Sequence, residues 1–194
     1  MSVAIIPARG GSTRIPGKNW NLFHGIPIIM YSIATAMESK LFDRIIVSTD
    51  SVEVRAVAKF AGVEVHDRKP EYCEDQVGTQ EVAKNVLEEC NVHHGRACVI
   101  YATAPLLVPS DLHRAHKLLE RHDANTVRFV YAVDSKGRDT GDFYFGLVDA
   151  FLSEASLEGR GVWTIKMPDS RAIDINTPED WAQAEAMFRA LQLA

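Results

Sequence analysis

The architecture of the chain is set by Val3-Ala4-Ile5-Ile6, a continuous apolar run that leads into a glycine-rich, basic segment. Runs of the same kind follow at Arg44-Ile45-Ile46-Val47-Ser48, Cys98-Val99-Ile100-Tyr101 and Thr126-Val127-Arg128-Phe129-Val130-Tyr131. Continuous rather than alternating apolarity predicts strands that are covered on both faces. The four runs therefore predict a buried sheet.

Segments with helical periodicity lie between these strands. The predicted helices run from Pro27 to Glu38, Ser51 to Ala61, Thr79 to Cys90 and Ser110 to His122. Pro27 suits a first helical position, and the predicted caps are Ser51, Thr79 and Ser110. A last helix is predicted after Thr177-Pro178-Glu179-Asp180, ending near Leu191. Strands that alternate with helices predict an α/β fold with a mostly parallel sheet, whose ligands lie beyond the carboxyl ends of the strands.

Length and composition narrow the class of protein. The chain has 194 residues, 46% hydrophobic and 24% charged, with a net charge of -5, which predicts one globular domain over residues 1–194. The acidic balance argues against nucleic-acid binding, so a small molecule is the expected partner. Three cysteines without a CxxC pair, no apolar run of membrane-spanning length and no signal-peptide pattern favour a cytoplasmic protein that contacts no membrane.

The segment after the first strand is Ala8-Arg9-Gly10-Gly11-Ser12-Thr13-Arg14-Ile15-Pro16-Gly17-Lys18-Asn19. Glycines let backbone N–H groups approach phosphate oxygens, while arginine and lysine neutralise phosphate charge. A solvated basic turn is the alternative. Three cations at the carboxyl end of the first strand, in an otherwise acidic protein, favour a polyphosphate site.

Two other phosphate motifs do not fit this segment. No glycine stands five residues before Gly17, and Lys18 is followed by Asn19 rather than Ser or Thr, so the segment is not a Walker A loop. Ser12 interrupts a GxGxxG pattern. An NAD-dependent oxidoreductase is therefore a weak alternative, because the α/β pattern alone does not assign a function.

The segment resembles the ARGGSxRxxxKN signature of the cytidylyltransferases that activate nonulosonic acids, the CMP-sialic acid synthetase group. This resemblance implies a Rossmann-like, mostly parallel sheet of the nucleotidyltransferase, or glycosyltransferase-A-like, type. Asn19 favours this group over the related Kdo cytidylyltransferases. The resemblance also implies that the CTP phosphates are held by Ala8, Arg9, Gly10, Gly11, Ser12, Arg14 and Lys18, with Asn19 at the edge of the site.

Further motifs match the same family. Val47-Ser48-Thr49-Asp50-Ser51 resembles a family run, which implies that Asp50 and Ser51 face the nucleotide, although a plain helix cap is the commoner explanation. Tyr101-Ala102-Thr103-Ala104-Pro105 resembles the pseudaminic acid branch and implies a nucleotide-binding role for Tyr101 and Thr103. Gly78-Thr79 also resembles that branch, which implies an anion contact at Thr79, with a helix cap as the alternative.

A segment near the carboxyl end, Ala172-Ile173-Asp174-Ile175-Asn176-Thr177-Pro178, resembles the family segment in which two alternating aspartates bind a divalent metal. Alternation points both side chains to one face of an extended backbone, and hard oxygen ligands suit Mg²⁺. The implied ligands are Asp174 and Asn176. Since Asn176 replaces the second acid and brings no charge, a structural turn before the last helix is the alternative.

The chain departs from the family between Val133 and Asp142, where most of a segment is absent. In the family this segment carries much of the sugar-acid site and contributes to the dimer interface. The shortened connection, 134–142, is polar and is predicted to be an exposed loop. The departure leaves both homodimer formation and the choice of acceptor open.

The function that follows is a metal-dependent cytidylyltransferase. The hydroxyl group of a nonulosonic acid, by preference pseudaminic acid, would attack the α-phosphate of CTP and release pyrophosphate. The expected catalytic residues are Arg9, Arg14 and Lys18, which would hold the pyrophosphate while Mg²⁺ offsets charge at the α-phosphate. Two alternatives stay open: a nucleotide-binding protein without turnover, and a nucleotidyltransferase that uses a smaller acceptor.

Overall fold

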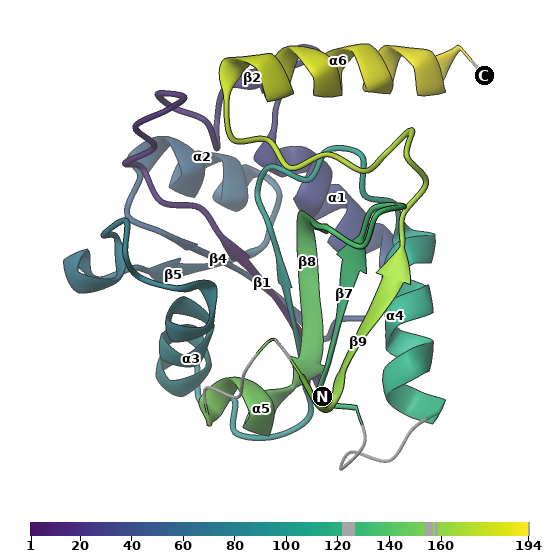
Figure 1. Cartoon of the computed structure of the whole chain (residues 1–194). Coiled ribbons are helices and arrows are strands. Elements are labelled where there is room, and N and C mark those ends of the chain that lie inside the picture. Colours follow the sequence, from purple (N-terminus) through teal and green to yellow (C-terminus); the bar gives the residue numbers. More distant parts are fainter. Residues whose placement is uncertain (122–126, 154–156, 158, 194) are drawn as a thin grey trace.

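The computed structural model describes residues 1–121, 127–153, 157 and 159–193 (Figure 1). In this part of the chain, the large sheet has seven strands in the order β5-β4-β1-β6-β8-β7-β9. The strands of this sheet are β1 (Ser2–Pro7), β4 (Arg44–Thr49), β5 (Glu64–Asp67), β6 (Arg96–Ile100), β7 (Phe129–Val133), β8 (Asp139–Leu147) and β9 (Val162–Lys166). A separate hairpin consists of β2 (Leu22–Phe23) and β3 (Ile26–Pro27).

Most strand pairs are parallel, which confirms the predicted fold class. β1 is parallel to β4 and β6, β4 is parallel to β5, and β7 is parallel to β9. β8 is antiparallel to both of its neighbours, β6 and β7. The carboxyl ends of β1, β4 and β6 therefore meet at one edge of the sheet, where ligands of open α/β sheets bind.

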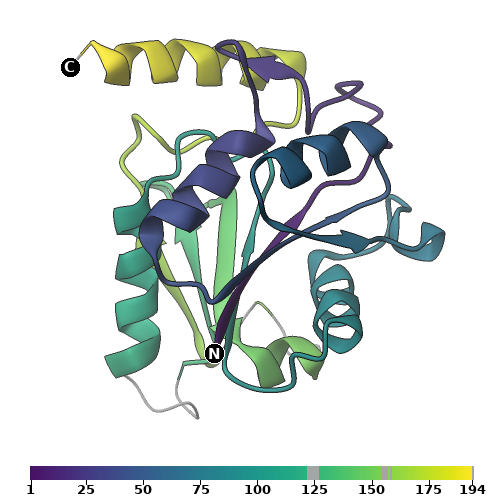
Figure 2. The same cartoon turned by 180° about the vertical axis from the view of Figure 1, so that it is seen from behind.

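Helices cover both faces of the sheet (Figures 1 and 2). α1, α2 and α4 contribute to the core on one face, while α3 and α5 contribute to the core on the other. None of the helices in the described ranges could cross a lipid bilayer, because none is both long and apolar enough. The helices are α1 (Ile29–Ser39), α2 (Val52–Phe60), α3 (Thr79–Glu89), α4 (Pro109–Arg121), α5 (Val148–Leu152) and α6 (Pro178–Gln192), with a short 3₁₀ helix, η1 (Pro70–Tyr72).

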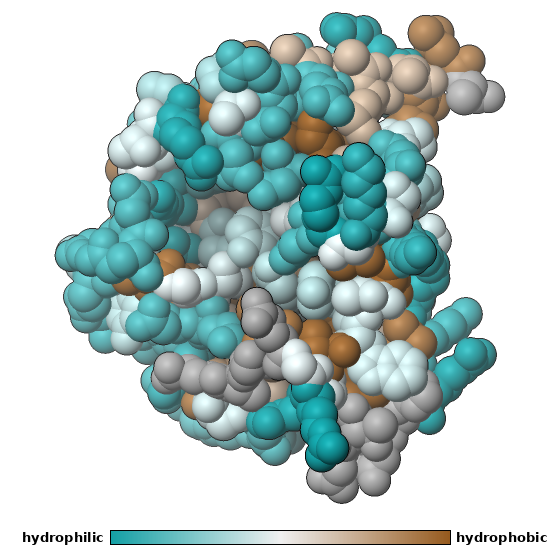
Figure 3. All heavy atoms as spheres, viewed as in Figure 1, coloured by the Kyte–Doolittle hydropathy of each residue, from teal (hydrophilic) through white to brown (hydrophobic). Residues whose placement is uncertain are grey.

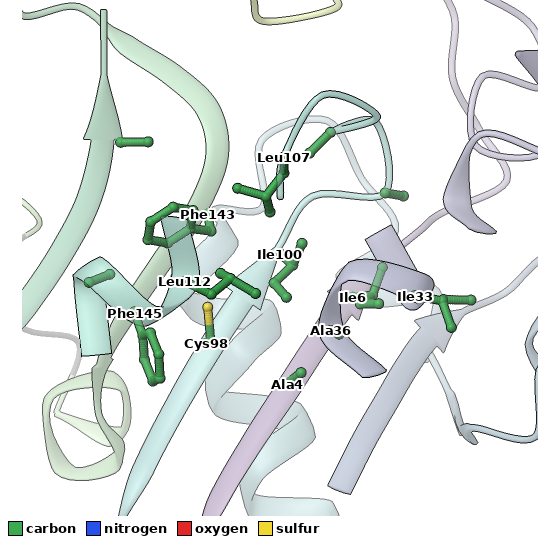
Figure 4. Close-up of a cluster of buried hydrophobic side chains, with 14 of the residues drawn as sticks. Ala4, Ile6, Ile33, Ala36, Cys98, Ile100, Leu107, Leu112, Phe143 and Phe145 are labelled. Atoms are coloured by element: carbon green, nitrogen blue, oxygen red, sulfur yellow. The ribbon is translucent and has the colours of Figure 1, made fainter. Parts of the chain in front are cut away.

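The larger core lies between the sheet and the first of these helix layers (Figure 4). Cys98 and Ile100 on β6 pack there with Phe143 and Phe145 on β8 and with Leu112 on α4. All five are buried, as expected for strands with continuous apolar sequence. A third cluster, which includes Phe23, Ile175 and Ala184, attaches the hairpin to α6 and to the segment before it.

Two of the predicted helix starts are confirmed. The Ser51 hydroxyl accepts a hydrogen bond from the Val54 amide, and the Thr177 hydroxyl accepts one from the Asp180 amide, each at 3.2 Å. The Asp180 carboxylate in turn accepts the Thr177 amide at 2.7 Å, which completes a capping box.

The helix starts predicted at Pro27 and Ser110 are wrong, whereas α3 begins at Thr79 as predicted, although Thr79 does not cap it. Pro27 lies in β3, because the hairpin takes up the residues before α1, and α1 begins at Ile29. Thr79 is the first residue of α3 rather than its cap, since Gly78 precedes it, and Ser110 lies within α4, which begins at Pro109. The predicted start of a strand at Thr126 and the predicted end of a helix at His122 fall outside the described residues.

The prediction of an exposed loop over 134–142 is also wrong for its second half. β8 begins at Asp139, and both Thr140 and Asp142 are buried. Only the first half is a turn, in which the Asp134 carboxylate accepts hydrogen bonds from the amides of Lys136 and Arg138 at 2.8 and 2.9 Å. Because this turn is so short, β7 and β8 must run antiparallel.

Candidate functional site

The candidate site is a cavity of about 440 Å³ beyond the carboxyl ends of β1 and β6. Figure 3 shows the hollowed, mostly hydrophilic face on this side of the molecule. The cavity brings together the glycine-rich loop that follows β1, the segment between β5 and α3, and the residues that follow β6. The predicted site residues that line it are Arg9, Ser12, Arg14, Lys18, Asn19, Thr79, Tyr101 and Thr103.

The three loop cations are each held by an acceptor from a distant part of the chain. Arg9 donates to the Cys73 carbonyl at 2.9 Å and forms an ion pair with Asp75. Arg14 donates to the Asn176 side-chain oxygen at 3.0 Å, and the Lys18 ammonium donates to the Ile175 carbonyl at 2.9 Å. Cations fixed in this way need little reorganisation when an anion binds.

Lys18 has the most unusual electrostatic surroundings of the three cations. Burial lowers the pKa of its ammonium, Asp174 opposes that effect, and the nearby Arg14 and Arg9 lower the pKa further. A half-buried ammonium between two guanidinium groups is poorly solvated. Its charged form is therefore stabilised by an anion with several oxygens, such as a polyphosphate.

A hydrogen bond joins the two ends of the glycine-rich loop, and Gly17 forms a turn near its second end. Asn19 is 8% exposed, and its amide donates to the Arg9 carbonyl at 2.9 Å. Gly17 has a φ of +70°, and a Cβ there would lie 2.8 Å from the Asn21 side-chain oxygen, so only glycine fits. Asn19 thus closes the loop as well as lining the cavity.

Asp50 lies beneath the loop and does not line the cavity. Its carboxylate accepts the Gly10 amide at 2.7 Å, while Ser51 caps α2 and donates to Glu53 at 2.6 Å. Ala8, Gly10 and Gly11 also lie outside the cavity lining. A nucleotide-binding role for these five residues stays a prediction.

The residues after β6 form the opposite wall. The Tyr101 and Thr79 hydroxyls are 2.6 Å apart, which links the end of β6 to the start of α3. Burial raises the pKa of Tyr101, so its hydroxyl remains protonated and available as a donor. Thr103 is buried at the edge of the cavity.

Asp174 and Asn176 lie next to the loop cations, as their predicted role requires. The Asn176 amide donates to the Asp174 carboxylate at 2.5 Å, and burial raises the pKa of Asp174, with Asn176 and Lys18 opposing the rise. Gly141 of β8 passes directly over this carboxylate: a Cβ there would come within 2.7 Å of Asp174 Oδ1. The close approach requires glycine and brings β8 to the rim of the site.

The protein oxygens at Asp174 and Asn176 supply only part of the ligand set that a divalent cation needs. Within the described ranges, no group of three acidic, histidine or cysteine side chains could hold a metal by itself. One carboxylate and one amide oxygen, completed by phosphate oxygens and waters, nevertheless form a set that Mg²⁺ accepts. The residues thus fit a metal that arrives with a nucleotide.

Sequence reasoning missed Arg68, which lines the cavity although it is only 7% exposed. Its guanidinium donates to the Ser48 hydroxyl at 3.2 Å and to the Ser48 carbonyl at 3.0 Å, and burial lowers its pKa. Arg68 directly follows β5, a four-residue strand with too little apolar sequence to be predicted. Because the strand before it could not be predicted, no pattern in the sequence identified Arg68 as a site residue.

Comparisons with known proteins agree with this geometry. A family model described as Cytidylyltransferase matches residues 3–158. The chain is 30% identical to the pseudaminic acid cytidylyltransferase of Campylobacter jejuni over 97% of this chain and 96% of that protein. It is 29% identical to the N-acylneuraminate cytidylyltransferase A of Danio rerio over 94% of this chain and 49% of that protein.

Solved structures confirm the nucleotidyltransferase type of the fold. The chain is similar to CMP:2-keto-3-deoxy-manno-octonic acid synthetase complexed with CTP, with a TM-score of 0.78 and 14% identity over 98% of this chain and 99% of that chain. It is also similar to Rv0371c of Mycobacterium tuberculosis in complex with manganese, with a TM-score of 0.69 and 15% identity over 95% and 98% of the two chains.

The Campylobacter jejuni relative also differs from this chain in length. The alignment with the Campylobacter jejuni protein extends over 223 residues, whereas this chain has 194, so that protein carries segments that are absent here. The location of the shortening at 134–142 stays a prediction. Because the family model spans most of the sequence, the chain belongs to the cytidylyltransferase family.

Proposed function

We propose that this protein transfers CMP from CTP to a nonulosonic acid, with pseudaminic acid or a close relative as the preferred acceptor. The acceptor hydroxyl oxygen forms a bond to the α-phosphorus, the bond between that phosphorus and the bridging oxygen breaks, and pyrophosphate leaves. The hydroxyl proton passes to solvent. The observation that carries this proposal is the set of three cations, Arg9, Arg14 and Lys18, held around one cavity beside Asp174.

Each of these cations has a defined task in the proposed reaction. Arg14 and Lys18 neutralise the pyrophosphate as its charge develops, and Arg9 holds the other side of the phosphate chain. Asp174 and Asn176 would hold Mg²⁺ together with phosphate oxygens, and the ion would supply charge neutralisation at the α-phosphate. For that contact the Asn176 oxygen must be shared with, or released by, Arg14.

We assign the acceptor to the open face of β7 and β8, which carries Tyr131, Asp139 and Tyr144 and is called the acceptor face below. The Tyr144 ring lies 5.5 Å from that of Tyr131 and 6.0 Å from that of Tyr101, which lines the nucleotide cavity. The Tyr144 hydroxyl donates to Asp139. An acceptor on this face would approach the phosphates from the side opposite the loop cations.

The test is pyrophosphate release from CTP over a panel of sugar acids, with the product identified by mass spectrometry. Arg14→Ala and Lys18→Ala should each lower kcat/KM by roughly 100-fold or more, as when a preorganised donor is removed. Lys59→Ala, an exposed lysine on α2, is the matched control and should leave the rate unchanged. Near-normal rates in both loop variants would overturn the proposal.

A second candidate function is nucleotide binding without turnover. The observation that favours it is Asn176, which stands where the resembled family has an acid and whose oxygen is engaged by Arg14. Calorimetry with CTP, with and without Mg²⁺, separates the two functions. Binding of CTP without a CMP-containing product for any acid supports the second candidate. A product in which CMP is joined to a hydroxyl compound smaller than a nonulosonic acid identifies a smaller acceptor.

A further inference from the structure

A line of hydrogen bonds runs behind the nucleotide cavity and joins β4, β5 and α3. Ser48 and His66 are register partners on the neighbouring strands β4 and β5. The Ser48 hydroxyl lies 3.1 Å from His66 Nδ1, and His66 Nε2 lies 3.0 Å from Glu89 Oε2 on α3. Ser48 is 0% exposed and His66 is 6% exposed, so water does not compete for the hydrogen bond between them.

The order serine, histidine, carboxylate is the one found in many hydrolases, but this serine cannot act as a nucleophile. No substrate carbonyl could reach a fully buried hydroxyl. The Ser48 hydroxyl oxygen also accepts a hydrogen bond from Arg68 Nε at 3.2 Å. The line therefore connects the Glu89 carboxylate to the Arg68 guanidinium in the cavity.

One assignment of the protons satisfies every donor and acceptor along this line. Arg68 Nε–H donates to the Ser48 oxygen, and the Ser48 hydroxyl donates to His66 Nδ1. In the same assignment His66 Nε2–H donates to Glu89. Hydrogen bonds from Lys69 and Asn85, and a smaller effect of His66, lower the pKa of Glu89 to about 2, which keeps it an acceptor.

The two bonds from Arg68 to Ser48 leave the Nη1 end of the Arg68 guanidinium for a ligand. Its Nε and Nη2 both donate to Ser48, at 3.2 and 3.0 Å. Among the described residues, Arg96 Nε is the one fully buried side-chain nitrogen or oxygen without a hydrogen-bond partner, so Arg68 Nη1, which donates to no protein acceptor in the described structure, retains accessible surface. Because Arg68 lines the cavity, this nitrogen is the one that can reach a nucleotide.

We propose that His66 is a positioning residue for nucleotide binding: through the Ser48 hydroxyl it holds the Arg68 guanidinium in the orientation that contacts CTP. This inference rests on the proposed function for the identity of the nucleotide. A merely structural histidine would affect the stability of the sheet without a specific effect on CTP affinity.

The test compares two substitutions that each keep one half of the imidazole. His66→Asn retains an oxygen near the Nδ1 position, which can accept from Ser48. His66→Gln retains a donor near the Nε2 position, which can reach Glu89, but presents no acceptor to Ser48. The affinity for CTP, measured by calorimetry on the full chain without acceptor, should fall about tenfold in His66→Gln and about twofold or less in His66→Asn, the size expected for a lost hydrogen bond to a charged group.

Ser48→Ala and His116→Asn complete the comparison. Ser48→Ala removes the acceptor of Arg68 Nε and should weaken CTP binding as much as His66→Gln. His116 is another mostly buried histidine beside a glutamate, 3.5 Å from Glu120, but it lies outside the cavity. His116→Asn should lower the melting temperature without changing CTP affinity.

The outcomes separate this inference from the proposed function. Unchanged CTP affinity in Ser48→Ala and His66→Gln, or equal losses in His66→Asn and His66→Gln, overturns the positioning role even if the wild type makes a CMP-sugar. CTP binding by the wild type without any product overturns the proposed transfer, while the differences in affinity still decide the role of His66. A wild type that does not bind CTP overturns both.

Discussion

The nucleotide cavity and the acceptor face are built by different interactions. In the cavity, Arg9, Arg14 and Lys18 are held by polar groups from segments more than 60 residues away along the chain. On the acceptor face, Tyr131 and Tyr144 rest on each other by ring contact. The difference shows that the cavity has a fixed arrangement of charges. The acceptor face, in contrast, is defined mainly by the shape of two strands.

The largest effect is expected at Asp174, which Asn176 links to Arg14 and which lines a second cavity together with Asp139 of the acceptor face. Asp174→Asn keeps the shape of the side chain but removes its charge, so transfer should slow by roughly 100-fold and require more Mg²⁺. Because burial raises the pKa of Asp174, the wild-type rate should fall as pH is lowered through that raised pKa, and the variant should lack this acidic decline. Rate profiles against pH and Mg²⁺ measure both effects.

Asp149→Asn on the exposed surface of α5 is the control for this substitution and should behave as the wild type. If Asp174→Asn kept the wild-type Mg²⁺ dependence, the metal would have to be held elsewhere, and the two regions would not share this carboxylate.

The next effect concerns Asp142, a buried carboxyl group on β8. Burial raises its pKa from 3.8 to about 7, and the Thr140 hydroxyl, which donates to it at 2.6 Å, offsets part of the rise. Since the folded pKa lies above the unfolded one, the favourable contribution of this group is fully present below about pH 4 and is lost as pH rises to about 7.

Asp142→Asn should therefore increase the free energy of unfolding at pH 8 by about 2 kcal/mol, and the two proteins should converge near pH 4. Urea denaturation across this pH range is the measurement. A variant that is less stable than the wild type at every pH would show that the acid is held ionised by its neighbours Arg171 and Thr140.

Gly141→Ala should have a smaller effect on stability and a specific effect on the site. The φ of Gly141 is +63°, so an alanine should lower the free energy of unfolding by about 1–2 kcal/mol. Gly137→Ala is a matched control, because Gly137 also has a positive φ, +81°, but open space around its Cβ position. Only Gly141→Ala should displace Asp174 and slow transfer; equal rates in the two variants would contradict the close approach.

The smallest effect is expected for the ion pair between Asp75 and Arg9. Asp75 is 68% exposed, and it occupies a cation that the proposed function assigns to phosphate. Asp75→Asn should tighten CTP binding about twofold, the modest size typical of an exposed pair. Asp67→Asn, which breaks the similar exposed pair with Arg55, should leave CTP affinity unchanged. Weaker binding in Asp75→Asn would mean that Asp75 orients Arg9 instead of competing for it.

Much of the fold could be predicted from the sequence because long apolar runs have few alternatives. β1, β4 and β6 carry continuous apolar sequence, and Ser51 and Thr177 cap helices by local hydrogen bonds that involve only neighbouring residues. β5 was not predicted because its four residues include Glu64, His66 and Asp67. The hairpin that contains Pro27 was missed because it is stabilised by contacts with α6, which no local pattern reveals.

The candidate site was predictable to the extent that its residues stand in one segment. The resemblance predicted the loop cations and Asp174 as parts of one site, because the loop and the segment of Asp174 are both recognisable motifs. Arg68 and the Ser48–His66–Glu89 line were missed because they come together only through strand register and the packing of α3. The direction of β8 was missed because apolarity does not distinguish parallel from antiparallel strands.

The contacts of Lys18 and Arg14 with Ile175 and Asn176 have a consequence for the order of events during protein synthesis. The loop leaves the ribosome before its partners, which follow it by 157 and 162 positions in the chain. A nascent chain that has folded β1, β4 and β6 therefore still lacks the groups that fix its cations. Until the segment before α6 has been translated and has docked, Arg14 and Lys18 lack these acceptors, so the charge arrangement of the cavity is complete only after that segment has docked.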